Sequence, residues 1–491
     1  MVKYQTKAMK FISIVMGFLL GGMMWRCRGE GGFGSSWGLY SVGLIILLVV
    51  YTFYGNKPNM KYEAIPFGAF LLGLGVTGYA TLMTQPAGIL ESDLPYLNGE
   101  PAFIPINYKS GLLMFIIMAF TFAPMFAFFV GSLFSNRKYG LKEYVIIILV
   151  FFAVGYIFKA TISHPIYKLI CPEQYLYTQK GLEASGLGDL TPYTAYMKHF
   201  AQRSWSDDIP FFENYYMSIE SISDALAILV CSLVTATAFK DKMTAIAGIV
   251  INAIVSVGST VTEVFYTWFI CDIYKTTGYG SKLGIFEKFI TRTDWGTWEF
   301  ATGAFFGLAV MLFIAFLPKK YTAQTVCDTT PLTKNKIMNF AANIVLTIFI
   351  FALTPSRAIG LRIGKLMEKA GMIENYHSIG DPLMIVLTVI LGIGFILMFR
   401  KNLFGRGIHI TGTDPVSFAK VALPAYASLC FILYLFTDNA PFIALAAKSV
   451  DAASFFTGLF SAEYFNLALV MIAFIVSALL YIPVRKKMKK Q

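Results

Sequence analysis

Residues 11–28 read FISIVMGFLLGGMMWRCR, an uncharged run from Phe11 to Trp25 that is followed at once by Arg26 and Arg28. The run has the composition of a membrane helix, because a helix that crosses the hydrocarbon core of a bilayer needs about 20 predominantly apolar residues. Lysines precede it, as in a signal peptide, but no small-residue cleavage pattern follows Trp25. We therefore expect a first transmembrane helix that is retained.

The whole chain has the composition of a membrane protein. Of its 491 residues, 56% are hydrophobic and 14% are charged, whereas soluble domains carry about 25% charged residues. Apolar runs lie at about residues 11–25, 37–54, 65–85, 109–135, 143–161, 219–239, 244–270, 298–318, 337–355, 383–399, 418–436 and 457–484. The sequence therefore predicts an all-α, polytopic integral membrane helix bundle with about 12 transmembrane helices.

Lysine and arginine are concentrated in short loops that fall on one side of this arrangement. These basic positions are Arg137, Lys138, Lys240, Lys242, Lys319, Lys320, Arg400, Lys401 and the tail at 485–490. Because positively charged short loops stay in the cytoplasm, we expect cytoplasmic N- and C-termini and a multi-pass protein of the cell (cytoplasmic) membrane. No basic stripe with interleaved aromatic residues stands out. We therefore assign the net charge of +12 to contact with membrane lipid and expect no nucleic-acid partner.

Three parts are expected along the chain. Residues 1–161 hold transmembrane helices 1–5 and a Gly/Arg-rich re-entrant segment at 26–36, residues 162–218 form an extracytoplasmic loop or cap, and residues 219–491 hold helices 6–12. Walker A, HExxH and GxSxG signatures are absent from the sequence, and the four histidines are dispersed. We therefore expect no metal site and no cofactor, and we favour a protein that is not an enzyme.

The first candidate site is the segment that follows Phe11–Trp25. At 1.5 Å per residue the run spans only about 22 Å of a core about 30 Å thick, so Arg26 and Arg28 should lie below the outer interface. Irregular backbone survives at that depth where protein or a water-filled cavity surrounds it. Guanidinium groups suit a phosphate or carboxylate, so the segment predicts an anion-binding element with Glu30 nearby. The alternative is an ordinary outer turn whose arginines reach the lipid headgroups or pair with Glu30.

The second candidate site lies in the apolar run 244–270. Asn252, Ser256, Ser259 and Glu263 recur at spacings of three and four, so they share one helix face. A carboxylate within the hydrocarbon should face the bundle interior or water, so Glu263 is a candidate for coupling to a proton or cation. The alternatives are polar contacts between helices, or an interfacial position for Glu263.

Other polar features have structural explanations. Glu220 with Asp224, and Trp298 with Glu299, stand at the starts of apolar runs, where acids complement the helix dipole and tryptophan favours the interface. Residues 358–369 predict an interfacial helix, to which Arg357 and Arg362 could add anion-binding groups.

These features favour a transporter or flippase for an anionic, phosphate- or carboxylate-bearing substrate, coupled to an ion gradient. In this hypothesis Arg26 and Arg28 bind the substrate while Glu263 couples the ion. The alternative is a membrane-embedded transferase that acts on a lipid-linked substrate at the outer face, with Glu30, Glu263 or an acid of the outer loop as general base. A third hypothesis is a non-catalytic membrane partner in a larger complex.

Overall fold

The computed structural model describes residues 6–30, 35–55, 57–62, 64–75, 96–97, 100–101, 108–199, 209, 212–269, 295–318, 321, 344, 348–403, 415–436, 441–461 and 463–489. The helices in these ranges are α1 (Lys7–Glu30), α2 (Ser35–Tyr54), α3 (Ala64–Gly75), α5 (Tyr108–Phe120), α6 (Pro124–Phe134), α7 (Leu141–Lys159), α8 (Ser163–Ile170), α9 (Pro172–Ala184), α10 (Pro192–His199), α11 (Phe212–Thr237), α12 (Lys242–Phe269), α15 (Trp295–Phe316), α18 (Thr354–Lys369), α19 (His377–Leu403), α20 (Pro415–Phe436), α21 (Pro441–Lys448), α22 (Ala452–Leu459) and α23 (Phe465–Lys489), with a π-helical segment η3 (Ile348–Leu353). Two-residue strands β1 (Tyr96–Leu97) and β2 (Glu100–Pro101) pair antiparallel.

Within the described ranges, eight helices are long and apolar enough to cross a membrane: α1, α7, α11, α12, α15, α19, α20 and α23. A further crossing is provided if α5 and α6 form one broken span, and α2 and α3 contain shorter apolar helices. The predicted multi-pass helical architecture is therefore confirmed. The count of twelve rests partly on the runs 65–85 and 337–355, which extend outside the described residues.

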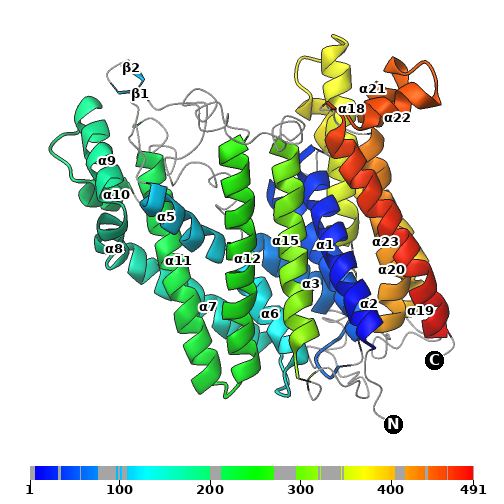
Figure 1. Ribbon diagram of the computed structural model, residues 1–491, viewed down its shortest axis with the longest axis horizontal. Coiled ribbons are helices and arrows are strands. Elements are labelled where there is room, and N and C mark those ends of the chain that lie inside the picture. Colours follow the sequence, from blue (N-terminus) through cyan, green and yellow to red (C-terminus); the bar gives the residue numbers. More distant parts are fainter. Residues whose placement is uncertain are drawn as a thin grey trace.

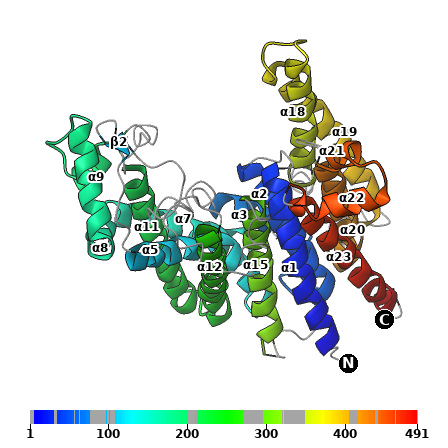
Figure 2. The same ribbon diagram turned by 45° about the horizontal axis from the view of Figure 1, so that its top comes forward.

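The first helix begins, and the last ends, at the same side of the bundle (Figure 1). We call this side, where Lys7 and Lys489 lie, the terminal side. Helices α8, α9 and α10 lie at the end of the molecule farthest from α18–α23, and α9 extends toward the opposite side (Figures 1 and 2). The expected loop at 162–218 is thus largely helical, and its residues 212–218 belong to α11.

A contact lined by glycine joins α1 to α15 at the centre of the bundle. A Cβ atom added to Gly21 would overlap the carbonyl oxygen of Gly303, and one added to Gly307 would overlap the carbonyl oxygen of Gly17. Two antiparallel GxxxG motifs therefore face each other, and their backbones approach more closely than any larger side chain permits. This contact fixes which residues farther along α1 meet the first turns of α15.

The predicted run 109–135 is not one continuous helix. Its two halves, α5 and α6, are bent by 49° at residues 121–123, because Pro124 supplies no backbone N–H and cannot continue the preceding helix. The side-chain oxygen Oδ1 of Asn252 accepts the freed N–H of Ala123 at 3.2 Å. Asn252 thereby satisfies a backbone group that would otherwise be buried without a partner.

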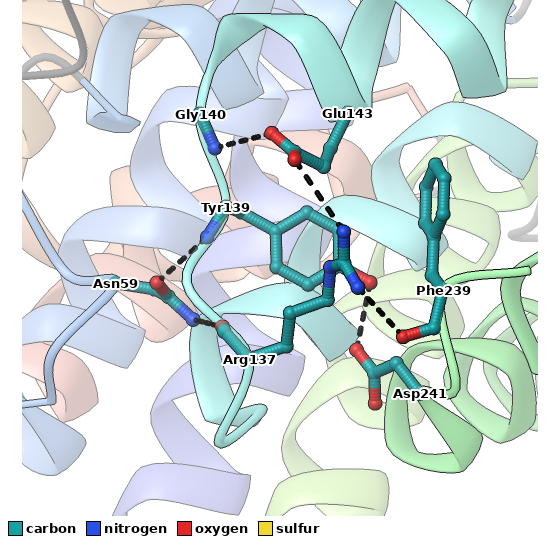
Figure 3. A network of polar contacts seen from close by, with 7 residues as sticks. All are labelled: Asn59, Arg137, Tyr139, Gly140, Glu143, Phe239 and Asp241. Atoms are coloured by element: carbon teal, nitrogen blue, oxygen red, sulfur yellow. Dashed lines mark hydrogen bonds and ion pairs between the residues drawn. The ribbon is translucent and has the colours of Figure 1, made fainter.

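Three loops on the terminal side are tied together by a partly buried polar network, which we call the three-loop network (Figure 3). Asn59 donates to the carbonyl oxygen of Arg137 at 2.7 Å and accepts from the N–H of Tyr139 at 3.2 Å. The Tyr139 hydroxyl donates to Asp241 at 2.7 Å, and Arg137 donates to the carbonyl oxygen of Phe239 at 2.8 Å. The α2–α3, α6–α7 and α11–α12 connections are therefore held as one unit.

Candidate functional site

Two arginines from the last turns of α1 share one carboxylate from the beginning of α15. Arg26 Nη1 donates to Glu299 Oε2 at 2.6 Å, and Arg28 Nη2 lies 3.6 Å from Glu299 Oε1. The exposed fractions are 2% for Arg26, 8% for Arg28 and 4% for Glu299. Both arginines are thus buried, and the described ionisable groups of this cluster carry one positive charge in excess.

Three glycines make room for this cluster. A Cβ atom on Gly29 would overlap the Glu299 carboxylate, one on Gly38 would overlap the Arg28 side chain, and one on Gly296 would overlap the Arg26 guanidinium. Gly29, Gly38 and Gly296 therefore serve side-chain packing. The expected irregular segment at 26–36 is also shorter than predicted, since residues 26–30 complete α1 and residues 35–36 begin α2.

Arg28 is less completely bonded than a buried guanidinium usually is. Its Nε and Nη1 atoms are buried and find no hydrogen-bond acceptor within the described part of the chain, and the same holds for Trp25 Nε1. The guanidinium lies over the Trp25 ring, 4.8 Å from its centroid. Buried donors of this kind are costly unless an acceptor binds them, so this position has a physical preference for an anion.

The cluster adjoins the break between α5 and α6. The ring of Trp25 contacts Phe122, which lies in the break, with 5.0 Å between their centroids. Phe122 in turn contacts Phe306 of α15 at 5.3 Å. The two arginines, their carboxylate partner and the interrupted helix are therefore neighbours in the bundle.

The polar face of α12 is occupied largely by contacts between helices. Asn252 bonds to Ala123 and to the carbonyl oxygen of Gly248, while Ser256 donates to the carbonyl oxygen of Ile116 at 2.7 Å. Ser259 is buried as well. The first two side chains thus fasten the broken helix, which is the structural alternative considered for this face.

Several of the remaining predicted site residues are not placed at the cluster. The side chains of Glu30 and Glu263 lie outside the described part, although their backbones belong to α1 and α12. Arg357 and Arg362 are partly exposed on α18, which packs chiefly against α19, whereas α1 packs chiefly against α15.

The sequence pattern predicts only a structural role for Glu299, at the start of a helix. Glu299 reaches the two arginines because α15 packs against α1. One feature of the sequence indicates that these two helices are neighbours. Gly303 and Gly307 repeat the spacing of Gly17 and Gly21, and matching small-residue motifs predict neighbouring helices.

A second polar cluster lies between α7, α8, α10 and α11. Lys159 pairs with Glu220, and the Tyr196 hydroxyl donates to Glu220 at 3.0 Å. His164 contacts the Tyr215 hydroxyl at 2.6 Å and the carbonyl oxygen of Lys159 at 2.7 Å. Burial lowers the pKa of His164 to about 4, so its imidazole is neutral near pH 7. Among the described residues, no group of three potential metal ligands converges.

Comparison with protein-family models, with curated proteins and with solved structures finds no match to this chain.

Proposed function

We propose that this chain is a membrane transporter or flippase that binds an anionic, phosphate- or carboxylate-bearing substrate at Arg28, beside Arg26 and Glu299. The observation that carries the proposal is the buried Arg28 guanidinium, whose Nε and Nη1 atoms find no acceptor within the described residues. Arg28 shares the Glu299 carboxylate with Arg26, but lies 3.6 Å from it, whereas Arg26 lies at 2.6 Å.

The energetics favour an exchangeable anion. Charged side chains within membrane-spanning helices are rare and mark substrate or ion pathways, because hydrocarbon solvates them poorly. The planar guanidinium presents several donors that match the oxygens of phosphate and carboxylate. A substrate anion at Arg28 would supply the missing acceptors and neutralise the excess charge of the cluster.

Transport is supported by the surroundings of the cluster. Discontinuous helices line the substrate sites of many transporters, and the break at residues 121–123 contacts Trp25 through Phe122. The three-loop network joins the connections on the terminal side, so we take that side to be closed and the opposite side to admit substrate. In this proposal the terminal side is cytoplasmic, and Glu263 is the coupling residue.

Binding can be tested by thermal unfolding of the purified protein in detergent with inorganic phosphate or succinate as probe. An anion present at 100 times its dissociation constant stabilises the folded state by about 2.7 kcal/mol. We expect one of the probes to raise the melting temperature of the wild type and to lose this effect in Arg28→Ala. The exposed Lys180 on α9 provides a control, since Lys180→Ala removes a cation without touching the cluster.

The anion that binds is then offered to proteoliposomes under an imposed proton gradient. Uptake by the wild type and none by Arg28→Ala is expected for a transporter. Chemical turnover of a lipid-linked phosphate in detergent, where no second compartment exists, would instead identify a transferase. Equal stabilisation of the wild type and Arg28→Ala by both probes would refute the binding site itself.

A further inference from the structure

A cavity of about 460 Å³ lies among α1, α20 and α23, and its lining includes none of Arg26, Arg28 and Glu299. Its walls include Met16 and Leu20 from α1, Pro424 and Ala427 from α20, and Ala478 and Arg485 from α23. We call it the α1–α20–α23 groove. Its size falls within the range of about 300–1,000 Å³ that is typical of sites for small organic ligands.

A specific contact joins α20 and α23 at the terminal-side end of the groove. Pro424 has no N–H, so the carbonyl oxygen of Lys420 lacks its usual helical donor. The Tyr481 hydroxyl of α23 donates to this oxygen at 2.5 Å. Farther along the same two helices, the rings of Phe431 and Phe474 stack at 4.2 Å. The helices touch at these two levels, while Ala427 and Ala478 between them leave space.

The chemistry of the groove differs along its length. Its walls are predominantly apolar, and Arg485 stands at the end of α23 on the terminal side. Within the described part of the chain, no acidic side chain forms an ion pair with Arg485. The sequence continues with Lys486, Lys487, Lys489 and Lys490. An apolar groove thus ends beside the Arg485 guanidinium, in a basic stretch of sequence.

We propose that the α1–α20–α23 groove binds one acyl chain of an anionic phospholipid from the terminal-side leaflet, with the lipid phosphate at Arg485. The groove lies among membrane-spanning helices, where lipid is the surrounding solvent. Its cationic end selects an anionic headgroup, since basic residues next to a transmembrane helix attract anionic lipids. This proposal does not rest on substrate binding at Arg28.

Native mass spectrometry of the purified protein with added phosphatidylglycerol or phosphatidylcholine tests this proposal. We expect the wild type to retain phosphatidylglycerol in preference to phosphatidylcholine by roughly fivefold, the effect of about one cation near the membrane surface. Ala478→Trp fills the groove and should abolish the retained lipid. Leu479→Trp is its matched control, because Leu479 is the next residue of α23 and is 62% exposed on the outer surface of the helix.

The headgroup is tested separately. Arg485→Gln should reduce the preference for phosphatidylglycerol to about one while leaving retention of phosphatidylcholine unchanged. Lys242→Gln, which removes an exposed cation on α12 at the same side of the bundle, should leave the preference unaltered. Ala427→Phe fills the groove from α20 and replaces Ala478→Trp should that variant fail to fold. Undiminished lipid retention when the groove is filled, or equal retention of both lipids by the wild type, would overturn the proposal.

Discussion

Replacing Glu299 by glutamine should have opposite effects on stability and on anion binding. The substitution keeps the size of the side chain but removes the carboxylate that Arg26 contacts at 2.6 Å and Arg28 at 3.6 Å. All three side chains are less than 10% exposed, so solvent cannot replace the lost charge. The described ionisable groups of the cluster would then carry two positive charges in place of one.

The magnitude follows from the burial of the pair. Removing one partner of a buried ion pair typically costs about 3–5 kcal/mol, because it leaves an uncompensated charge in a medium of low dielectric constant. An exposed pair would lose at most about 1 kcal/mol. We therefore expect Glu299→Gln to lower the free energy of unfolding by about 3–5 kcal/mol. Arg26→Gln in the same chain should restore part of this loss, because the single remaining cation is Arg28.

Equilibrium unfolding in mixed micelles, followed by tryptophan fluorescence, measures these values for the wild type, both single variants and the double variant. The series is repeated with inorganic phosphate, which should stabilise Glu299→Gln more than the wild type, since the variant's cluster carries two positive charges in place of one. A loss below about 1 kcal/mol would refute the buried pair. Weaker stabilisation of Glu299→Gln than of the wild type by phosphate would refute the anion-binding interpretation.

Two further predictions concern other parts of the bundle. Gly21→Leu should lower the free energy of unfolding by about 1–3 kcal/mol through overpacking against Gly303. Gly394→Leu is the control and should cause no such loss, because a Cβ atom at Gly394 meets no described atom within 4 Å. Equal losses for the two variants in thermal unfolding would contradict the α1–α15 contact. Burial lowers the pKa of Lys57 from 10.5 to about 8. Between pH 8 and 10.5 the Lys57 amine is therefore protonated in the unfolded chain and neutral in the folded one. The free energy of unfolding should then rise with pH across this range, by up to about 3 kcal/mol. Lys57→Met should abolish this rise and the exposed Lys142→Met should preserve it; an unchanged rise in Lys57→Met would rule out the effect.

Much of the fold can be predicted because each membrane helix corresponds to one continuous apolar run of the sequence. The apolar runs at 143–161 and 418–436, for example, correspond closely to α7 and α20. The break within 109–135 was not anticipated, although Thr121-Phe122-Ala123-Pro124 contains its signal: the residue before a proline is biased away from the helical conformation. The break is not evident from hydropathy because the residues on both sides of Pro124 are apolar and uncharged.

The candidate site was only half predicted, for a physical reason. The burial of Arg26 and Arg28 can be predicted from the length of the uncharged run that precedes them, which is read directly from the sequence. Their partner Glu299 is separated from Arg26 by 273 positions, and periodicity within one helix does not reveal which other helix lies beside it. The same limit explains Asn252, whose polar face was evident while its partner Ala123 was not.

The contact lined by glycine between α1 and α15 also restricts which conformational changes the molecule can make. Gly17, Gly21, Gly303 and Gly307 are in register, and a slide of one residue would drive larger side chains into the opposite backbone. The two helices must therefore travel together as a rigid block, carrying Arg26, Arg28 and Glu299 with them. Rearrangement would then occur at other contacts between helices, so the charged cluster would change its surroundings and not its internal geometry.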